Sequence, residues 1–112
     1  MRAEQSLRGA AAFDAVYRRG RRADGHLLGL RALPNESPVN RYGFSINKRV
    51  GGAVVRNRLR RRLRHILRDF GLAHGWDLAL TGRPPAALAS YEELRREMSA
   101  LLQRAGVTRV AG

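Results

Sequence analysis

The residues with the clearest chemical potential form one run of positive charge. From Ser37 to Arg68 the chain carries no Asp or Glu, while the stretch that begins at Lys48 holds nine basic side chains. An arginine presents a planar fork of N–H donors that matches a phosphate group. The run therefore has the chemistry to bind a polyanion. Its basic members are Lys48, Arg49, Arg56, Arg58, Arg60, Arg61, Arg62, Arg64 and Arg68.

Apolar spacing predicts that most of this run belongs to an amphipathic helix. At about 100° per residue, one arc collects Val55, Leu59, Leu63, Ile66, Leu67 and Phe70. The opposite arc carries Asn57, Arg60, Arg61, Arg64 and Arg68, with Arg56, Arg58 and Arg62 on the flanks. A solvated helix face normally mixes charges of both signs. We therefore expect one face to pack on a core and the other to bind phosphates, with Asn57 available to a base edge or a 2′-hydroxyl.

Two details of this helix leave alternatives open. Arg62 projects near the apolar arc, so it either binds RNA or lays its stem over core residues. Gly51 and Gly52 precede the helix, and they either let an anion approach the backbone or only form a turn.

Other side chains offer little catalytic chemistry. The chain has no cysteine, and its three histidines, His26, His65 and His74, are not spaced as metal ligands or placed beside a carboxylate cluster. We therefore expect no catalytic group and no metal site in the protein itself.

Length and charge limit the class of protein. The 112 residues suit a single domain, and 22 basic against nine acidic residues give a formal charge of +13. A nucleic acid is the expected partner, and composition alone leaves duplex DNA open. With no bilayer-spanning apolar run and no signal peptide, we expect a cytoplasmic protein without a membrane partner. A cationic membrane-binding helix fits poorly, because the core needs its apolar arc.

Several elements must position the basic helix. The pattern predicts a helix over Gly9 to Arg19 that ends at Gly20, and strands over His26 to Leu33 and Arg41 to Asn47. Turn-forming residues at 34–38 favour an antiparallel hairpin between these two strands. A further short strand is expected over Trp76 to Leu80, followed by a loop at 82–85.

The C-terminal part is predicted to be helical. Ser90 and Glu93 have the spacing of a capping box at a helix start. The helix that follows presents an apolar stripe to the sheet, formed by Leu94, Met98, Leu101, Leu102 and Ala105. Residues 106–112 are expected to form a flexible tail, which leaves a core of about 7–103.

The run from Lys48 to Arg64 resembles the signature of the protein subunit of bacterial ribonuclease P. That signature is a basic pair, a Gly-x-Ala-Val step, Arg-Asn-Arg and a basic helix, and here it is ungapped. The Arg41-Tyr42-Gly43-Phe44-Ser45 strand and the Ser90-Tyr91-Glu92-Glu93 helix start agree with it. The resemblance covers about residues 7–103.

The resemblance implies a fold and a function. The fold is an α+β sandwich of order α-β-β-β-α-β-α, with a four-stranded mixed sheet and a left-handed βαβ crossover, although most such crossovers are right-handed. Our own pattern shows three strands, so the fourth lies at 21–24 or splits 26–33. The implied function is that of the RNA-binding subunit of a ribonucleoprotein that removes the 5′ leader of precursor tRNA. The RNA subunit performs the hydrolysis and mainly holds the Mg²⁺ ions.

The resemblance also assigns two binding surfaces. The catalytic RNA contacts the basic motif and adjoining basic residues, here Lys48, Arg49, Arg56, Asn57, Arg58, Arg60, Arg61, Arg62, Arg64 and Arg68. A cleft between the first helix and the sheet receives the leader, with Phe13 and Tyr17 at its aromatic positions and Ser45 and Asn47 on the sheet side. Phe13 and Tyr17 equally fit ordinary core packing. The partners are thus ribonuclease P RNA and precursor tRNA, with no obligate protein partner; the alternative is a small ribosomal or general RNA-binding protein.

Overall fold

One mixed sheet supports all the helices of the structure. A computed structural model describes residues 4–107 of the chain. Its elements are β1 (Glu4–Ser6), α1 (Ala10–Arg19), β2 (Arg21–Asp24), β3 (Leu28–Pro34), β4 (Asn40–Ile46), α2 (Ala53–Phe70), β5 (Trp76–Gly82), the short 3-10 helix η1 (Pro84–Leu88) and α3 (Tyr91–Ala105).

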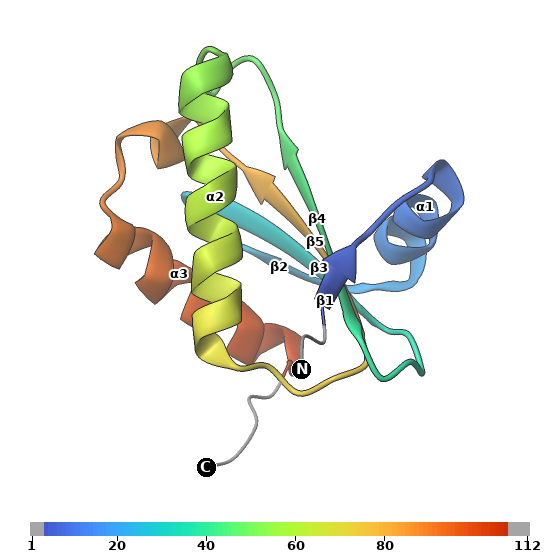
Figure 1. Ribbon diagram of the computed structural model, residues 1–112. Helices are drawn as coiled ribbons and strands as arrows, with labels where there is room; N and C mark the ends of the chain where they lie inside the picture. The colour runs from blue at the N-terminus through green and yellow to red at the C-terminus, as the bar shows by residue number, and fades with distance from the viewer. Residues whose placement is uncertain (1–3, 108–112) are drawn as a thin grey trace.

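The sheet divides the helices into two groups. Its strand order is β1-β4-β5-β3-β2, with β4 parallel to β1 and β5, and β3 antiparallel to β5 and β2. Helices α2 and α3 cover one face, whereas α1 lies alone on the other (Figure 1). The two faces therefore provide two separate places where a helix and the sheet can form a binding surface.

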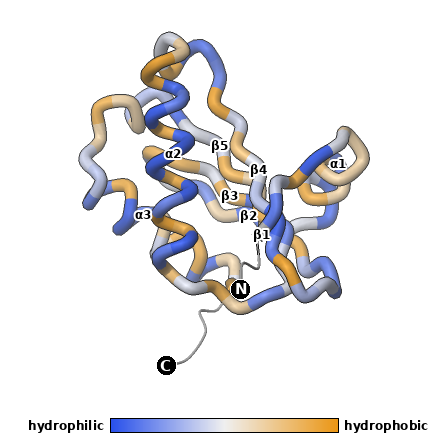
Figure 2. The backbone as a smooth tube through the Cα atoms, viewed as in Figure 1, coloured by the Kyte–Doolittle hydropathy of each residue, from blue (hydrophilic) through white to orange (hydrophobic). Residues whose placement is uncertain are grey.

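The main core lies between the sheet and the pair α2 and α3. Leu28, Leu30, Leu78 and Leu80 point from the strands into this layer, and each is at most 1% exposed. The predicted apolar arc of α2 is buried there from Leu59 onward, while Val55 is half-buried. In Figure 2 the orange, apolar segments of α2 alternate with blue segments along the helix. The amphipathic prediction for this segment is confirmed.

Helix α3 closes the same layer. The Ser90 hydroxyl accepts from the Glu93 N–H while the Glu93 carboxylate accepts from the Ser90 N–H, so the predicted capping box is present. The predicted apolar stripe is buried. Gly106 ends the helix in the left-handed conformation, and Val107 is buried with its N–H bonded to the carbonyl of Leu102. The first two residues of the predicted tail are therefore fixed, and 108–112 lie outside the described residues.

The expected strand count was wrong by one. Among residues 4–107 the sheet has five strands, because β1, a polar segment of three residues, pairs in parallel with Asn40–Tyr42 of β4. The following Leu7 N–H continues the pairing by donating to the carbonyl of Tyr42. A strand this short shows no alternation of apolar and polar residues, so no periodic signal exists to predict it. After β1, the element order is the one that the resemblance implies, with β2 at the expected 21–24.

The predicted hairpin between β3 and β4 was also wrong. Both strands form, but β5 lies between them and pairs with β3 along its whole length and with β4 from Asp77 to Gly82. Helix α2 carries the chain across the sheet and returns it as this central strand, which extends to Gly82 rather than ending at Leu80. The two strands are close in sequence, yet pairing with β5 buries apolar side chains on both faces. The left-handed sense of this parallel crossover stays a prediction.

Candidate nucleic-acid interface

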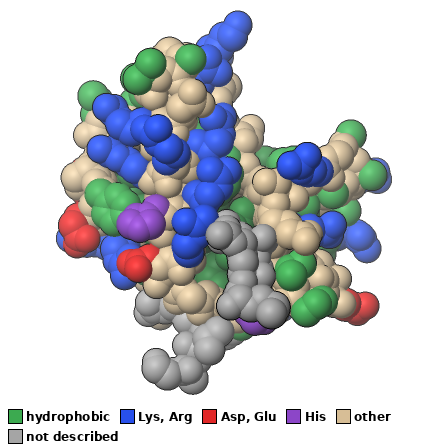
Figure 3. Space-filling model, in the orientation of Figure 1, with side chains coloured by type: hydrophobic (Ala, Val, Ile, Leu, Met, Phe, Trp, Pro, Cys, Tyr) green, Lys and Arg blue, Asp and Glu red, His purple; other side chains and the backbone are tan. Residues whose placement is uncertain are grey.

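The ends of α2 fix which way its arginines point. The helix begins after Gly52 and ends at Gly71, which has the left-handed φ of 60° that favours glycine. Between these ends the buried residues hold one face against the sheet and α3. The other face must then point to solvent, and Figure 3 shows Lys and Arg side chains in blue along the length of α2.

Four arginines recur at intervals of four residues along α2, and this row consists of Arg56, Arg60, Arg64 and Arg68. The guanidinium of Arg64 lies 5.2 Å from the ring centroid of Phe44 on β4, a cation–π distance. The Arg56 Nε donates to the carbonyl of Gly51 at 3.1 Å, and Arg60 donates to the side-chain oxygen of Asn57 at 2.8 Å. The contact between Arg64 and Phe44 places this row on the side of α2 that faces β4.

The remaining arginines of α2 occupy the side toward α3. Arg58 and Arg61 are exposed and Arg62 is half-buried. One turn farther along, the His65 Nδ1 lies 3.0 Å from the hydroxyl of Tyr91, the first residue of α3. His65 is therefore a surface residue on the helix flank, bonded to a tyrosine. The half-buried position of Arg62 is compatible with both roles that the sequence left open.

The loop before α2 adds positive charge at the helix N-terminus. Lys48 and Arg49 are exposed there. The side-chain oxygen of Asn47 accepts from the Arg49 N–H at 2.9 Å, and its carbonyl accepts from the Val50 N–H at 3.1 Å. Asn47 thus begins the turn, and the structure commits its side-chain oxygen to the loop.

Along the sequence, the basic run contains no acidic residue before the end of α2. The first acidic residue after Ser37 is Asp69, whose carboxylate accepts from Arg95 of α3 at 2.8 Å. Positive charges close together on one helix repel one another, so binding a polyanion would relieve repulsion as well as form hydrogen bonds. The face is built for an extended anion rather than for a single small one.

On the opposite face of the sheet, α1 packs mainly on β3 and β5. Its Val16 is fully buried against Leu7 and Ala79 in a small second core. The Phe13 ring packs on bare backbone, because a Cβ at Gly43 would lie 2.4 Å from its Cζ atom. Phe13 is half-buried. Phe13 therefore serves mainly to pack α1 against the sheet.

Tyr17 behaves differently from Phe13. Its side chain is 36% exposed, and its hydroxyl lies 3.4 Å from the hydroxyl of Thr81 on β5. Arg31 of β3 places its guanidinium 5.0 Å from the ring centroid and donates to the carbonyl of Tyr17 at 2.9 Å. The ring is thus fixed at the border between α1 and the sheet, with part of its surface open to solvent.

Strand register brings Ser45 to the same border. Ser45 of β4 pairs with Thr81 of β5, and it alternates with Tyr42 and Ile46, whose side chains face the main core. Tyr17, Ser45 and Thr81 therefore lie together on the sheet face beside α1, where the sequence predicts a cleft, and we call this surface the α1 cleft. Phe13 packs at one end of it, and Asn47 lies beyond it in the loop. The sequence reading missed Thr81 and Arg31. Their only signal is alternation within strands whose order the sequence does not reveal.

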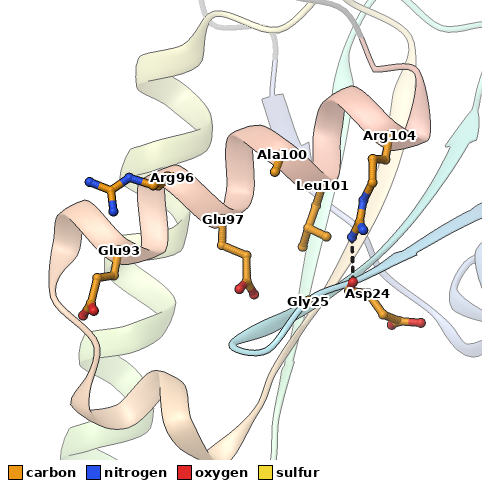
Figure 4. Close-up of a pocket in the computed structure, with 8 residues that line it drawn as sticks. All are labelled: Asp24, Gly25, Glu93, Arg96, Glu97, Ala100, Leu101 and Arg104. Carbon is orange, nitrogen blue, oxygen red and sulfur yellow. Dashed lines mark hydrogen bonds between the residues drawn. The ribbon is translucent and has the colours of Figure 1, made fainter.

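A groove of about 410 Å³ lies between α3 and the turn after β2. Its charged groups hold the fold: Glu97 accepts from the N–H groups of Leu27 and Leu28, and Arg104 donates to the carbonyl of Asp24. Figure 4 shows the Asp24 side chain turned away from this groove. The groove is therefore a structural junction.

Within residues 4–107, no three His, Asp or Glu side chains gather as a metal site. None of the helices in that range is long and apolar enough to cross a bilayer.

Comparisons with known proteins agree on one family. The family model described as Ribonuclease P matches residues 1–106. A ribonuclease P protein component from Roseiflexus castenholzii is 42% identical, over 99% of this chain and 93% of its own length. One from Dehalococcoides mccartyi is 40% identical, over 85% of this chain and 79% of its own length.

Solved structures show the same fold. A mutant RNase P protein from Staphylococcus aureus superposes with a TM-score of 0.83 at 20% identity, covering 94% of this chain and 89% of its own. The RNase P protein from Thermotoga maritima gives 0.78 at 21% identity, covering 96% and 98%.

Proposed function

The chain belongs to the ribonuclease P protein family, and we propose that α2 binds the catalytic RNA while the α1 cleft binds the leader of precursor tRNA. As a member it is the RNA-binding protein component of a tRNA-processing ribonucleoprotein endoribonuclease. What the proposal adds is the division of work between two surfaces on opposite faces of the sheet.

The observation that carries the proposal is the charge of α2. Its exposed face carries arginines along its whole length, and the chain has no acidic residue between Ser37 and Asp69. A folded RNA presents many phosphates at once, which suits a rigid row of guanidinium groups. We assign the RNA-subunit contacts to Lys48, Arg49, Arg56, Asn57, Arg58, Arg60, Arg61, Arg62, Arg64 and Arg68.

The leader assignment rests on the α1 cleft. A partly exposed tyrosine ring beside hydroxyl groups can stack on an unpaired base while Ser45 and Thr81 bond to its edge or backbone. We give Tyr17 the stacking role and Phe13 a supporting one, because the Phe13 ring is packed on Gly43. Asn47 would meet the RNA from the loop at the end of the cleft.

The protein is a binding subunit in this account, and the hydrolysis belongs to the RNA. Mg²⁺ ions prefer oxygen ligands and commonly keep several waters. We assign them mainly to the RNA subunit and its phosphates. They would supply the metal-assisted attack on the phosphodiester, while the residues of this chain hold the two RNAs together.

The substitution Tyr17→Ala tests the leader assignment. In the reconstituted holoenzyme this substitution should weaken the binding of precursor tRNA by about 1–3 kcal/mol, the value of one base–aromatic stack. The binding of mature tRNA should be unchanged. The measurement is the pair of dissociation constants for precursor and mature tRNA. Tyr17→Phe is the matched control, because it keeps the ring and should retain most of the preference.

Equal losses for precursor and mature tRNA would contradict the leader assignment. A general RNA-binding protein would give that result, since it has no reason to distinguish a substrate with a leader from one without.

A further inference from the structure

A second cluster of arginines lies on the sheet face that α1 covers, at the edge away from α2. Arg22 of β2 pairs in register with Arg31 of β3, and Ala23 between Arg22 and Asp24 points into the main core. Arg22, Asp24 and Arg31 therefore share the α1 face. Arg83 follows β5 and reaches the same place by donating to Asp24. We call Arg22, Arg31 and Arg83 the distal arginine cluster.

The cluster holds more positive charge than its acidic partner can balance. The Asp24 carboxylate accepts from the Arg22 Nε at 2.5 Å and from the Arg83 Nη2 at 2.7 Å. Its pKa is lowered, chiefly by the hydrogen bond from Arg22 and also by the charges of Arg83 and Arg31. Three guanidinium groups around this one carboxylate leave a local excess of two positive charges. Within residues 4–107, the buried Nε of Arg83 also has no hydrogen-bond partner.

The floor of the cluster is bare backbone. A Cβ at Gly29 would lie 3.0 Å from the Arg83 Nη2 and 3.2 Å from an Asp24 carboxylate oxygen, so a side chain there would crowd both groups. Gly29 thereby leaves the guanidinium of Arg83 close to the sheet surface. An incoming phosphate could therefore approach the backbone at Gly29 with arginine side chains around it.

The cluster is continuous with the α1 cleft. Asp24, Gly29 and Thr81 occupy paired positions on the neighbouring strands β2, β3 and β5. Strands lie about 4.8 Å apart, which places the cluster about 10 Å from Thr81. Arg31 joins the two regions directly, because its guanidinium also contacts the ring and the carbonyl of Tyr17.

We propose that the distal arginine cluster binds a backbone phosphate of the leader, upstream of the nucleotide that stacks on Tyr17. This rests on the proposed function. Helix α2 lies toward β4, so a leader emerging from the catalytic RNA crosses the sheet in the order β4, β5, β3, β2. It passes Ser45, then Tyr17 and Thr81, and then the cluster. Only a leader long enough to cross the sheet reaches the final position.

The test compares leader lengths in the reconstituted holoenzyme. Precursor tRNAs with leaders shortened one nucleotide at a time are titrated against the wild-type protein and the double variant Arg22→Gln, Arg83→Gln. Short leaders should bind both proteins equally. Long leaders should bind the double variant about tenfold more weakly, the loss expected for charge-assisted contacts to one phosphate.

Two further variants keep the outcome interpretable. Arg22→Gln alone changes a side chain that is 66% exposed, so it should fold normally and show a smaller loss with the same dependence on leader length. Arg96→Gln is the control, because it also removes one positive charge from an exposed side chain, here on α3 on the other face of the sheet. This variant should bind leaders of every length as the wild type does.

Failure of this inference differs from failure of the proposed function. If wild-type holoenzyme prefers precursor to mature tRNA but neither Arg22 variant shows a loss confined to long leaders, the cluster does not bind the leader. If wild-type holoenzyme shows no such preference, the leader assignment itself fails.

Discussion

At the residue scale, the two aromatic side chains of α1 show that helical spacing determines the side on which a ring lies, whereas its neighbours in the fold determine its role. Phe13 and Tyr17 lie one turn apart, so the sequence places both rings on one side of a helix. The rings nevertheless differ in role, because Gly43 accommodates Phe13 whereas Thr81 and Arg31 hold Tyr17 at a solvent-exposed border. Those neighbours lie on strands that are distant in sequence, so no local pattern around Tyr17 predicts them.

A partly buried ion pair joins two of the strands that carry the cleft. Arg41 of β4 binds both carboxylate oxygens of Asp77 on β5, at 2.7 and 2.6 Å, and Asn35 donates to one of them at 2.8 Å. Asp77 is 4% exposed. The hydrogen bonds to Asp77 raise the pKa of Arg41, so the guanidinium stays charged throughout the neutral range.

Removing the arginine would leave a buried carboxylate without its partner charge. Arg41→Met should lower the free energy of unfolding by about 2–3 kcal/mol, measured by urea denaturation at neutral pH. The control Arg18→Met breaks the exposed pair with Asp14 on α1 and should change stability by less than about 1 kcal/mol. Equal effects of the two substitutions would contradict a structural role for the Arg41–Asp77 pair.

At the element scale, the helices were predictable and the strand pairing was only partly so. Helices α2 and α3 show long apolar periodicity, and α3 adds a capping box, so their boundaries can be read locally. Strand β1 has three polar residues and no such signal. The hairpin prediction for β3 and β4 failed because these strands are consecutive in sequence but are not adjacent in the sheet. Only the crossover through α2 explains why β5 lies between them.

The arginine row of α2 has a measurable consequence as an element. If α2 neutralises Z phosphates, the logarithm of the RNA affinity falls with the logarithm of salt concentration with a slope of about −0.7Z to −0.9Z. Replacing Arg60 and Arg64 together by alanine should flatten this slope by about two contacts, measured as binding of ribonuclease P RNA across a salt series. Arg96→Ala on α3 should leave the slope unchanged. An unchanged slope in the double variant would remove Arg60 and Arg64 from the interface.

At the scale of the whole molecule, composition indicated the class of partner and the sheet explains how one small domain can bind two RNAs. A net charge of +13 points to nucleic acid but does not say where it binds. The layered fold puts α2 with its arginines on one face and the α1 cleft on the other, joined across β4 (Figure 1). The segments that form the cleft are distant in sequence. Periodicity therefore predicts the individual helices and strands, whereas the family resemblance predicts how they are arranged.

The most direct test of the account is cleavage of precursor tRNA by a bacterial ribonuclease P RNA, followed as leader release at physiological Mg²⁺ with and without this protein. We expect the protein to stimulate cleavage, and we expect the stimulation to vanish when Arg56, Asn57 and Arg58 are replaced by alanine in a variant that remains folded. Tight RNA binding without stimulation, or stimulation that survives these replacements, would contradict the assignment of α2 as the surface that binds the catalytic RNA.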